Sequence, residues 1–244
     1  MWEITLVFDS NDISDICAFK EGFYKECKDK TLFLSEAVNA GDCILSIAVS
    51  KDNIELIRLV KLELAKLIIM VTKYEYFINN LFVDRKNKEI SQFIAKIMVS
   101  IGSEYEVLCA LGMLNQCYIY VRSFVRFKLR DIVTGWHKMA HSLNSVFTDI
   151  SDSELICEFL KYIVTITNTD DVILFLEVVG DKYIVSTSNN KTVTVNALDK
   201  ATLVITLLNY RPKNIVIRNS AVFDKEVYAF LKYVFNSKLS VEVW

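Results

Sequence analysis

The sequence is poor in the residues that force turns. Among 244 residues it contains one proline, Pro212, and six glycines. Glycine and proline are the strongest local breakers of helices and strands, so their scarcity predicts few obligatory turns and long uninterrupted elements. This composition argues against a β-sandwich, which needs many short strands joined by turns, and favours a helix-rich fold.

The sequence also lacks a long apolar run. The longest run without a charge, residues 107–121, is interrupted by Asn115 and Gln116, and it is shorter than the ~18–20 residues that a membrane-spanning helix needs. Residues 1–4 lead directly into a strand-like pattern, so we expect no signal peptide. The cysteines form no C-x-x-C motif, and we expect them to be reduced, mostly buried and in a cytoplasmic protein. They are Cys17, Cys27, Cys43, Cys109, Cys117 and Cys157.

No familiar catalytic motif is present. The sequence contains no G-x-S-x-G, no G-x-x-x-x-G-K-[ST] and no G-x-G-x-x-G, and its only two histidines fall on one predicted helix. The acidic pairs Asp170–Asp171 and Asp149 with Asp152 stand beside caps and turns, where aspartate binds backbone groups. A cysteine nucleophile stays open, because thiol reactivity depends on surroundings that a sequence does not give.

The overall composition is that of a globular protein. Hydrophobic residues make up 52% of the chain, charged residues make up 24%, and the formal net charge is −2. Nothing in this balance attracts nucleic acid. A local basic stripe can still bind an anionic partner, because potential at contact range matters more than the sum of charges.

Hydrophobic periodicity divides the chain into three parts, which could form one compact unit. Residues 1–84 predict a β-α-β-α order, residues 85–169 a helical middle, and residues 170–244 a β-β-β-α-β-α-β order. We therefore predict an α+β protein with a C-terminal mixed sheet. The strands at the two ends of the chain could also share one sheet.

The expected elements have recognisable start and stop signals. In the first part they are a strand at 2–8, a helix at 13–27 capped by Asn11 and Asp12, a turn at Gly41–Asp42, a strand at 43–49, and a helix from an Asp52–Glu55 capping box to about Asn79. In the middle they are helices at 90–101, from a Ser103–Glu106 box toward Gln116, at 118–147, and from a Ser151–Glu154 box to Ile166. In the last part they are strands at 172–179, 182–186 and 192–195, a helix from Asp199 that Pro212 stops, a strand at 213–218, a helix at 224–235 and a strand at 239–243.

The predicted helix at residues 118–147 carries a basic stripe opposite an apolar face. With ~3.6 residues per turn, Arg126, Arg130, His137 and His141 fall on nearly the same side, with Arg122 beside them. Acidic residues on neighbouring helices, or water alone, could neutralise this stripe. The candidate acids are Glu104, Glu106, Glu154 and Glu158.

Three segments share their order and spacing with a known family. They are SFVRFKLR at residues 123–130, EFLKYIV at 158–164 and KNIVI at 213–217. They resemble the YtxC family of sporulation proteins from spore-forming bacteria, which has an F-x-R-F-[RK]-L helix, a second helix, a hairpin and a Pro-terminated helix before an I-V-I strand. The resemblance covers residues 118–244 well and the N-terminal half only in its order of elements.

The resemblance implies a soluble protein of sporulating cells and supplies no molecular activity. Many family members carry a histidine after the I-V-I strand and a cysteine-rich tail. This chain has Arg218 at the first place and the residues VEVW at 241–244. A metal or redox role of the tail is therefore not carried over.

Two histidines have the spacing of metal ligands. His137 and His141 are four residues apart, as in helical zinc sites, but zinc needs a third and usually a fourth ligand. The segment HKMAH at residues 137–141 lacks the glutamate of H-E-x-x-H. We predict no metal and no cofactor, and we interpret the pair as exposed polar residues.

We interpret the basic stripe as a contact face for an unidentified acidic protein. Its members are Arg122, Arg126, Arg130, His137 and His141. Arginine pairs bidentately with carboxylate or phosphate. Membrane headgroups rank second and nucleic acid last, because no aromatic-studded basic groove accompanies the stripe. The helix at residues 53–79 is apolar over a broad arc, which either the rest of the chain or a second subunit covers.

The alternative is an enzyme. A hydrolytic or nucleic-acid-processing activity would use acidic residues near strand ends of the C-terminal part, such as Glu177 and Asp181. This hypothesis rests only on the mixed α/β pattern, and a fold pattern alone does not specify a function.

Overall fold

The computed structural model has an α+β fold, which confirms the predicted fold class. It describes residues 1–9, 23, 32–39, 41–82, 88–147, 151–167, 169–189, 191–197, 199–219 and 223–242. The chain divides into two compact units. Unit 1 comprises Met1–Asp84 and Ile101–Asn144, and unit 2 comprises Arg85–Ser100 and Ser145–Trp244.

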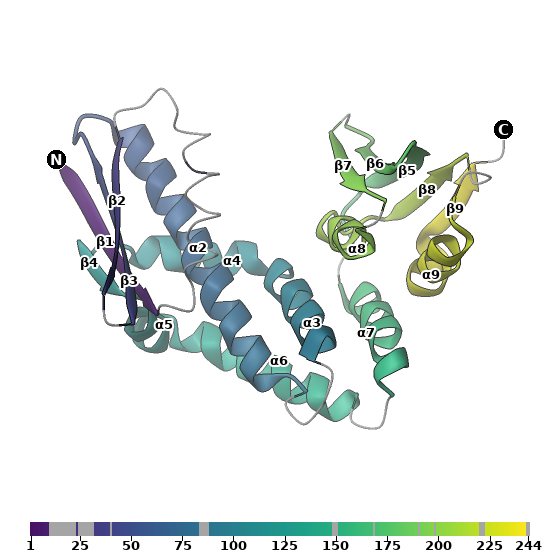
Figure 1. Ribbon diagram of the computed structural model, residues 1–244, viewed down its shortest axis with the longest axis horizontal. Helices are drawn as coiled ribbons and strands as arrows, with labels where there is room; N and C mark the ends of the chain where they lie inside the picture. The colour runs from purple at the N-terminus through teal and green to yellow at the C-terminus, as the bar shows by residue number, and fades with distance from the viewer. Residues whose placement is uncertain are drawn as a thin grey trace. The chain divides into compact units, whose positions relative to one another are not determined.

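Unit 1 is built on a sheet in which four described strands pair in the order β2-β3-β1-β4 (Figure 1). They are β1 (Trp2–Asp9), β2 (Leu32–Asn39), β3 (Asp42–Val49) and β4 (Tyr118–Tyr120). Strand β3 pairs antiparallel with β1 and β2, whereas β4 pairs parallel with β1. Alternate side chains of β3 are buried, the period-2 pattern of a sheet with one face on the core.

Strands β1 and β3 confirm the strands expected at residues 2–8 and 43–49. Strand β2 is additional to the expected β-α-β-α order. It is an edge strand whose side chains are only half-buried or exposed. Such a strand needs no strong alternation of apolar residues, and its sequence shows none. The helix expected at residues 13–27 lies outside the described residues, apart from Phe23.

Helix α2 (Ile54–Asn80) is the long helix that the sequence predicts, shifted by one residue. Its N-cap is Asn53, whose side chain accepts a hydrogen bond from the backbone N–H of Leu56 at 3.1 Å. The N-cap is therefore Asn53 and not Asp52, the residue that the expected capping box assigned to this position. Helix α4 (Ser103–Met113) packs against α2. The chain itself buries the apolar arc of α2, including Leu56, Val60 and Leu64 at 0% exposure, without a second subunit.

The prediction of a single basic helix at residues 118–147 is wrong. Residues 118–120 form β4, and the helix beyond them is divided into α5 (Val121–Lys128) and α6 (Arg130–Val146). The interruption is at Leu129, where φ is −106° and ψ is 28°. Burial explains both departures, because Ile119 inserts into the sheet and Leu129 into the core, each 2% exposed. Tertiary packing here overrides helical periodicity.

Leu129 is bonded to both helices. The backbone N–H of Leu129 donates to the Val125 carbonyl at 3.2 Å, and the N–H of Val133 donates to the Leu129 carbonyl at 3.0 Å. These are helical i to i−4 bonds. One bond closes α5 and the other opens α6, so the two helices meet at Leu129 without forming one regular helix.

Unit 2 contains a second sheet, with described strands in the order β7-β6-β5-β8-β9. The strands are β5 (Ile173–Val179), β6 (Lys182–Thr187), β7 (Thr192–Asn196), β8 (Asn214–Arg218) and β9 (Leu239–Glu242). Helices α8 (Lys200–Asn209) and α9 (Lys225–Phe235) connect the last three strands. This order confirms the β-β-β-α-β-α-β prediction. No described strand of one sheet pairs with the other sheet, so the ends of the chain do not share one sheet.

The structure distributes residues 85–169 over both units. Helices α4 and α5, and α6 as far as Asn144, belong to unit 1, whereas α3 (Lys88–Ser100) and α7 (Asp152–Ile166) belong to unit 2. The packing partners explain this division, because α4 contacts α2, while α3 contacts α7 and α8. Ser151 is the N-cap of α7, as expected, but its hydroxyl donates to Glu154 Oε2 at 2.8 Å and does not cap the helix backbone as a capping box would.

Replacing Asp199 with alanine should destabilise the protein by about 1 kcal/mol at neutral pH, the usual effect of losing an N-cap. Its carboxylate accepts hydrogen bonds from the Thr202 hydroxyl at 2.6 Å and the Thr202 N–H at 2.9 Å. These bonds lower the pKa of Asp199. Folding thus favours the ionised form, and this stabilisation is lost as pH falls through the lowered pKa. Urea unfolding at neutral pH and at about pH 3 measures both effects.

The Asp199→Asn variant is the matched control. Its side-chain oxygen can still accept the Thr202 N–H, but it has no carboxyl group to titrate. Asn should therefore keep most of the stability and lose the pH dependence. An asparagine variant as unstable as the alanine variant would contradict the capping role.

Candidate functional site

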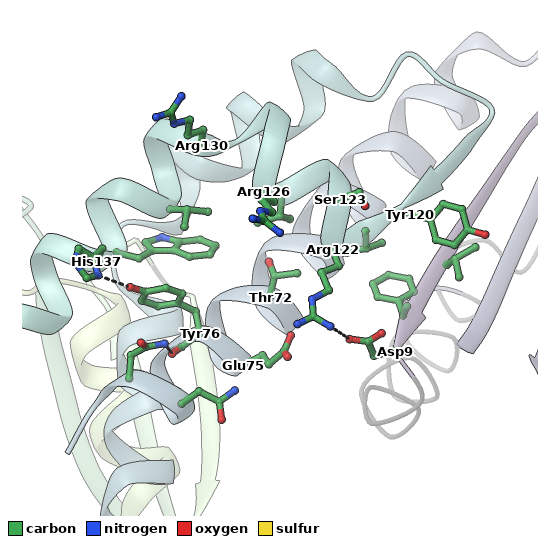
Figure 2. A pocket seen from close by; sticks show the side chains of 18 of the residues that line it. Asp9, Thr72, Glu75, Tyr76, Tyr120, Arg122, Ser123, Arg126, Arg130 and His137 are labelled. Carbon is green, nitrogen blue, oxygen red and sulfur yellow. Dashed lines mark hydrogen bonds and ion pairs between the residues drawn. The ribbon is translucent and has the colours of Figure 1, made fainter. Parts of the chain in front are cut away.

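A groove of about 780 Å³ opens on unit 1 between α2 and the pair α5–α6. Strand ends of the sheet close one end of it (Figure 2). The walls are amphipathic helix faces, and the lining side chains on α2 recur at intervals of three and four residues. These are Thr72, Glu75, Tyr76, Asn79 and Asn80.

The opposite wall carries most of the predicted basic face. Arg122, Arg126, Arg130 and His137 all line the groove, and all are exposed. They line the same wall although Leu129 interrupts the helix between Arg126 and Arg130. His141 is also exposed but is not among the residues that line the groove.

Arg122 has partial neutralisation at the strand end of the groove. Its guanidinium lies 3.7 Å from Asp9 Oδ2, and the two side chains are 82% and 41% exposed. Figure 2 shows the guanidinium between the carboxylates of Asp9 and Glu75. An ion pair this exposed contributes only about 0.2–1 kcal/mol, so it orients Arg122 more than it stabilises the fold.

Arg126 and Arg130 have no carboxylate partner within the part of the chain that the structure describes. Arg126 lies over the exposed Phe127 ring, with Cζ 5.7 Å from the ring centre. None of the four candidate acids forms an ion pair with the groove arginines among the described residues. Glu106 binds Lys73, Glu154 binds Ser151, Glu158 binds Tyr233, and Glu104 is exposed. Arg126 and Arg130 thus line the groove without an internal counter-ion among the described residues, and Figure 2 shows the Arg130 guanidinium pointing outward from α6.

His137 contacts the α2 wall. Its Nδ1 lies 3.3 Å from the Tyr76 hydroxyl, and the donor depends on the imidazole tautomer. The Tyr76 ring lies 5.7 Å from the Trp136 ring, and burial raises the pKa of the Tyr76 phenol. Tyr76 therefore remains protonated at neutral pH and links the two walls.

A buried polar network lies behind these aromatic rings. Glu106 Oε2 is 2.9 Å from Lys73 Nζ, and Trp136 Nε1 donates to Glu106 Oε1 at 2.7 Å. Lys73 is 0% exposed and also donates to the Ile101 carbonyl at 2.7 Å. Burial lowers the pKa of Lys73, and the Glu106 carboxylate opposes this effect.

The expected capping role of Glu106 is therefore wrong. The N-cap of α4 is Gly102, with φ at 69°, and the Glu106 carboxylate binds Lys73 and Trp136. The buried cation explains the change, because an unpaired buried charge costs far more than an uncapped helix end. One signal in the sequence points to this partner. Lys73 is four residues from both Ile69 and Phe77, in the apolar stripe of α2.

The acids of the enzyme hypothesis belong to unit 2 and are not among the residues that line the groove. Glu177 is half-buried on β5 opposite Ile184, and Asp181 is exposed in the hairpin between β5 and β6. Asp170 and Asp171 are exposed before β5, and Asp171 pairs with Lys213 at 3.0 Å. Among the described residues, no three His, Cys, Asp or Glu side chains gather as metal ligands would.

The cysteines are less buried than expected. Of the four described, Cys43 is buried, Cys109 and Cys157 are half-buried, and Cys117 is exposed. None is in a disulfide. Burial, together with Glu158, raises the pKa of the Cys157 thiol, which opposes the thiolate form that a nucleophile needs.

Comparison with known proteins gives no family for this chain. No protein-family model, no curated protein and no solved structure matches it. Within the residues that the structure describes, no helix is both long and apolar enough to cross a bilayer.

Replacing Lys73 with methionine should destabilise the protein by about 3–5 kcal/mol, because the Glu106 carboxylate is then buried without a counter-charge. Chemical denaturation measures the loss. The double variant Lys73→Met/Glu106→Gln should recover much of it, since glutamine is neutral and its oxygen can accept from Trp136 Nε1. Equal losses in the single and double variants would contradict the charge-pairing explanation.

Proposed function

We propose that this chain is a non-enzymatic, cytoplasmic interaction protein of sporulating cells. In this proposal it binds an acidic partner protein through the groove wall formed by Arg122, Arg126, Arg130 and His137, with His141 at its margin. The observation that supports this function best is the pair of exposed arginines, Arg126 and Arg130, which line the groove and have no carboxylate partner among the described residues. Exposed arginine retains its fork of donors for carboxylates of another molecule.

The composition of the groove favours a protein over a polyanion. Asp9, Asp42 and Glu75 line the same groove as the arginines. A nucleic acid presents negative charge continuously along its backbone, so these carboxylates would repel it. A protein segment places its charges residue by residue and can avoid such contacts.

The setting in sporulation rests on the resemblance of residues 118–244 to the YtxC family. The FVRFKLR segment forms most of α5 and the start of α6. Its arginines Arg126 and Arg130 are thus also the groove residues of the proposal. The two arguments meet on the same side chains but are independent, one resting on sequence pattern and the other on geometry.

Binding can be tested with a labelled poly-glutamate peptide of about ten residues, which spans roughly 35 Å when extended. Fluorescence anisotropy at low salt should show binding that weakens as salt screens the charges. The variant Arg126→Glu/Arg130→Glu should weaken binding roughly tenfold or more, because each reversal replaces an attraction with a repulsion. Lys128→Glu/Lys138→Glu is the matched control, with the same charge change on α5 and α6 outside the groove lining.

Equal weakening in both double variants would mean that net charge, rather than the groove, attracts the peptide. Tighter binding to single-stranded DNA or to anionic vesicles than to the peptide, lost in the groove variant, would replace the protein partner by one of these. Either result would overturn the proposal.

The biological setting has its own test. In a spore-forming host, the variant Arg126→Glu/Arg130→Glu should lower the yield of heat-resistant spores relative to the Lys128→Glu/Lys138→Glu control, at equal protein levels. An unchanged spore yield would contradict a role of this groove in sporulation, whatever the peptide result.

A further inference from the structure

We propose that the groove recognises a bipolar segment of its partner, in which an acidic run lies next to a basic side chain. This inference rests on the proposed function and adds the charge pattern of the partner. It follows from the separation of positive and negative side chains within the groove, which the following observations describe.

The basic side chains extend along the α5–α6 wall. Arg126 lies on α5, and Arg130 and His137 lie two turns apart on α6. Figure 2 shows Arg126 at the middle of the groove, His137 beside Tyr76, the Arg130 side chain pointing outward from α6, and Arg122 nearer the sheet. A partner segment along this wall meets guanidinium groups over several residues.

The negative side chains gather at the other end. Asp9 and Asp42 are the last register pair of the β1–β3 ladder, so their side chains start directly opposite each other. Figure 2 shows Glu75 of α2 on the same side as Asp9. Like charges that face each other across two strands are destabilising, and only Asp9 has an arginine partner among the described residues.

The charge at this end is therefore incompletely balanced. Of the three carboxylates in the lining, Asp9 pairs with Arg122, and neither Asp42 nor Glu75 forms an ion pair in the described part of the chain. A hydrogen bond with Tyr120 is the main cause that raises the pKa of the neighbouring Tyr118 phenol, and the charge of Asp42 makes the smallest contribution in the same direction. A cation from a partner would relieve the repulsion.

A uniformly acidic segment fits this groove less well. It would gain contacts with Arg126 and Arg130 but would place negative charge beside Asp9, Asp42 and Glu75. A segment with a lysine or arginine at that end replaces this repulsion with attraction. Electrostatic complementarity of this kind mainly determines which partner is accepted.

The test compares three labelled peptides of about ten residues. One is poly-glutamate, and the other two carry a lysine pair at the amino or the carboxyl end of the same glutamate run, because the direction of the segment is open. Fluorescence anisotropy should show that one lysine peptide binds roughly threefold to tenfold more tightly than poly-glutamate, the range expected for one or two exposed ion pairs. The other lysine peptide, in which the basic end meets Arg130, should bind no more tightly than poly-glutamate.

The variant Asp9→Asn/Asp42→Asn should abolish the advantage of the lysine peptide. It should also strengthen poly-glutamate binding, because Arg122 loses its internal partner. Asp52→Asn/Asp181→Asn is the control, with the same charge change at two exposed carboxylates outside the groove. It should leave the preference intact, and circular dichroism checks that both variants are folded.

The outcomes separate this inference from the proposed function. If poly-glutamate binds through Arg126 and Arg130 but neither lysine pair tightens binding, the bipolar pattern is wrong and the acidic-partner function stands. If both lysine peptides gain equally, or if the gain survives in Asp9→Asn/Asp42→Asn, the carboxylate end does not select the cation. If no peptide binds, the proposed function itself fails.

Discussion

The Glu106 carboxylate connects three helices of unit 1. It lies on α4, pairs with Lys73 of α2 and accepts a hydrogen bond from Trp136 of α6. Removing a charge from water costs several kcal/mol, and only a close partner with further hydrogen bonds repays that cost. Lys73 meets this requirement with the Glu106 carboxylate, the Ile101 carbonyl and the Ser103 hydroxyl. The three helices must therefore approach in one arrangement. The network thus contributes more to the specificity of the fold than to its stability.

This network determines how the residues of α6 are oriented in the groove. Trp136 points inward to Glu106 and is 2% exposed, so the next residue, His137, is directed toward the groove, where it meets Tyr76. Arg130 precedes Trp136 by six residues on the same helix, whereas Arg126 and Arg122 lie on α5, beyond the interruption at Leu129. The α6 part of the basic wall is thus positioned by a buried pair that contains none of its residues. A change at Glu106 would reach the groove through α6.

Local signals in the sequence account for much of the fold. The C-terminal order of elements could be predicted because its helices begin at capping aspartates, Asp199 and Asp224, and its strands are separated by turn residues. The break at Leu129 could not, because Leu129 is a good helix former in a helical pattern, and its departure depends on the core that buries it. Strand β4 could not be predicted for the same reason, because Ile119 forms a strand only where β1 is available to pair with it.

The basic residues of the candidate site could also be identified from spacing, whereas their acidic neighbours could not. Arg122, Arg126 and Arg130 are spaced four residues apart and His137 follows seven residues later, and helical periodicity alone relates these positions. Asp9, Asp42 and Glu75 join them only through the β1–β3 register and the packing of α2, which are long-range contacts. The assignment of Glu106 failed in a different way. Its spacing from Ser103 matches a capping box, but the carboxylate binds a buried lysine thirty-three residues earlier in the chain.

Exposed charges alone give a groove of this kind selectivity rather than tight binding. Each long arginine side chain must lose rotamer freedom to hold a carboxylate, and water and salt weaken the attraction. Apolar side chains between the charges can supply the missing affinity, because burial contributes about 25 cal/mol per Å². Val133 is half-buried in the groove wall and Tyr120 adds an exposed ring, whereas Val121 and Val125 are already buried by the chain itself. A partner segment with one apolar side chain among its charges would combine selective ionic contacts with apolar burial, whereas a purely ionic segment would dissociate quickly.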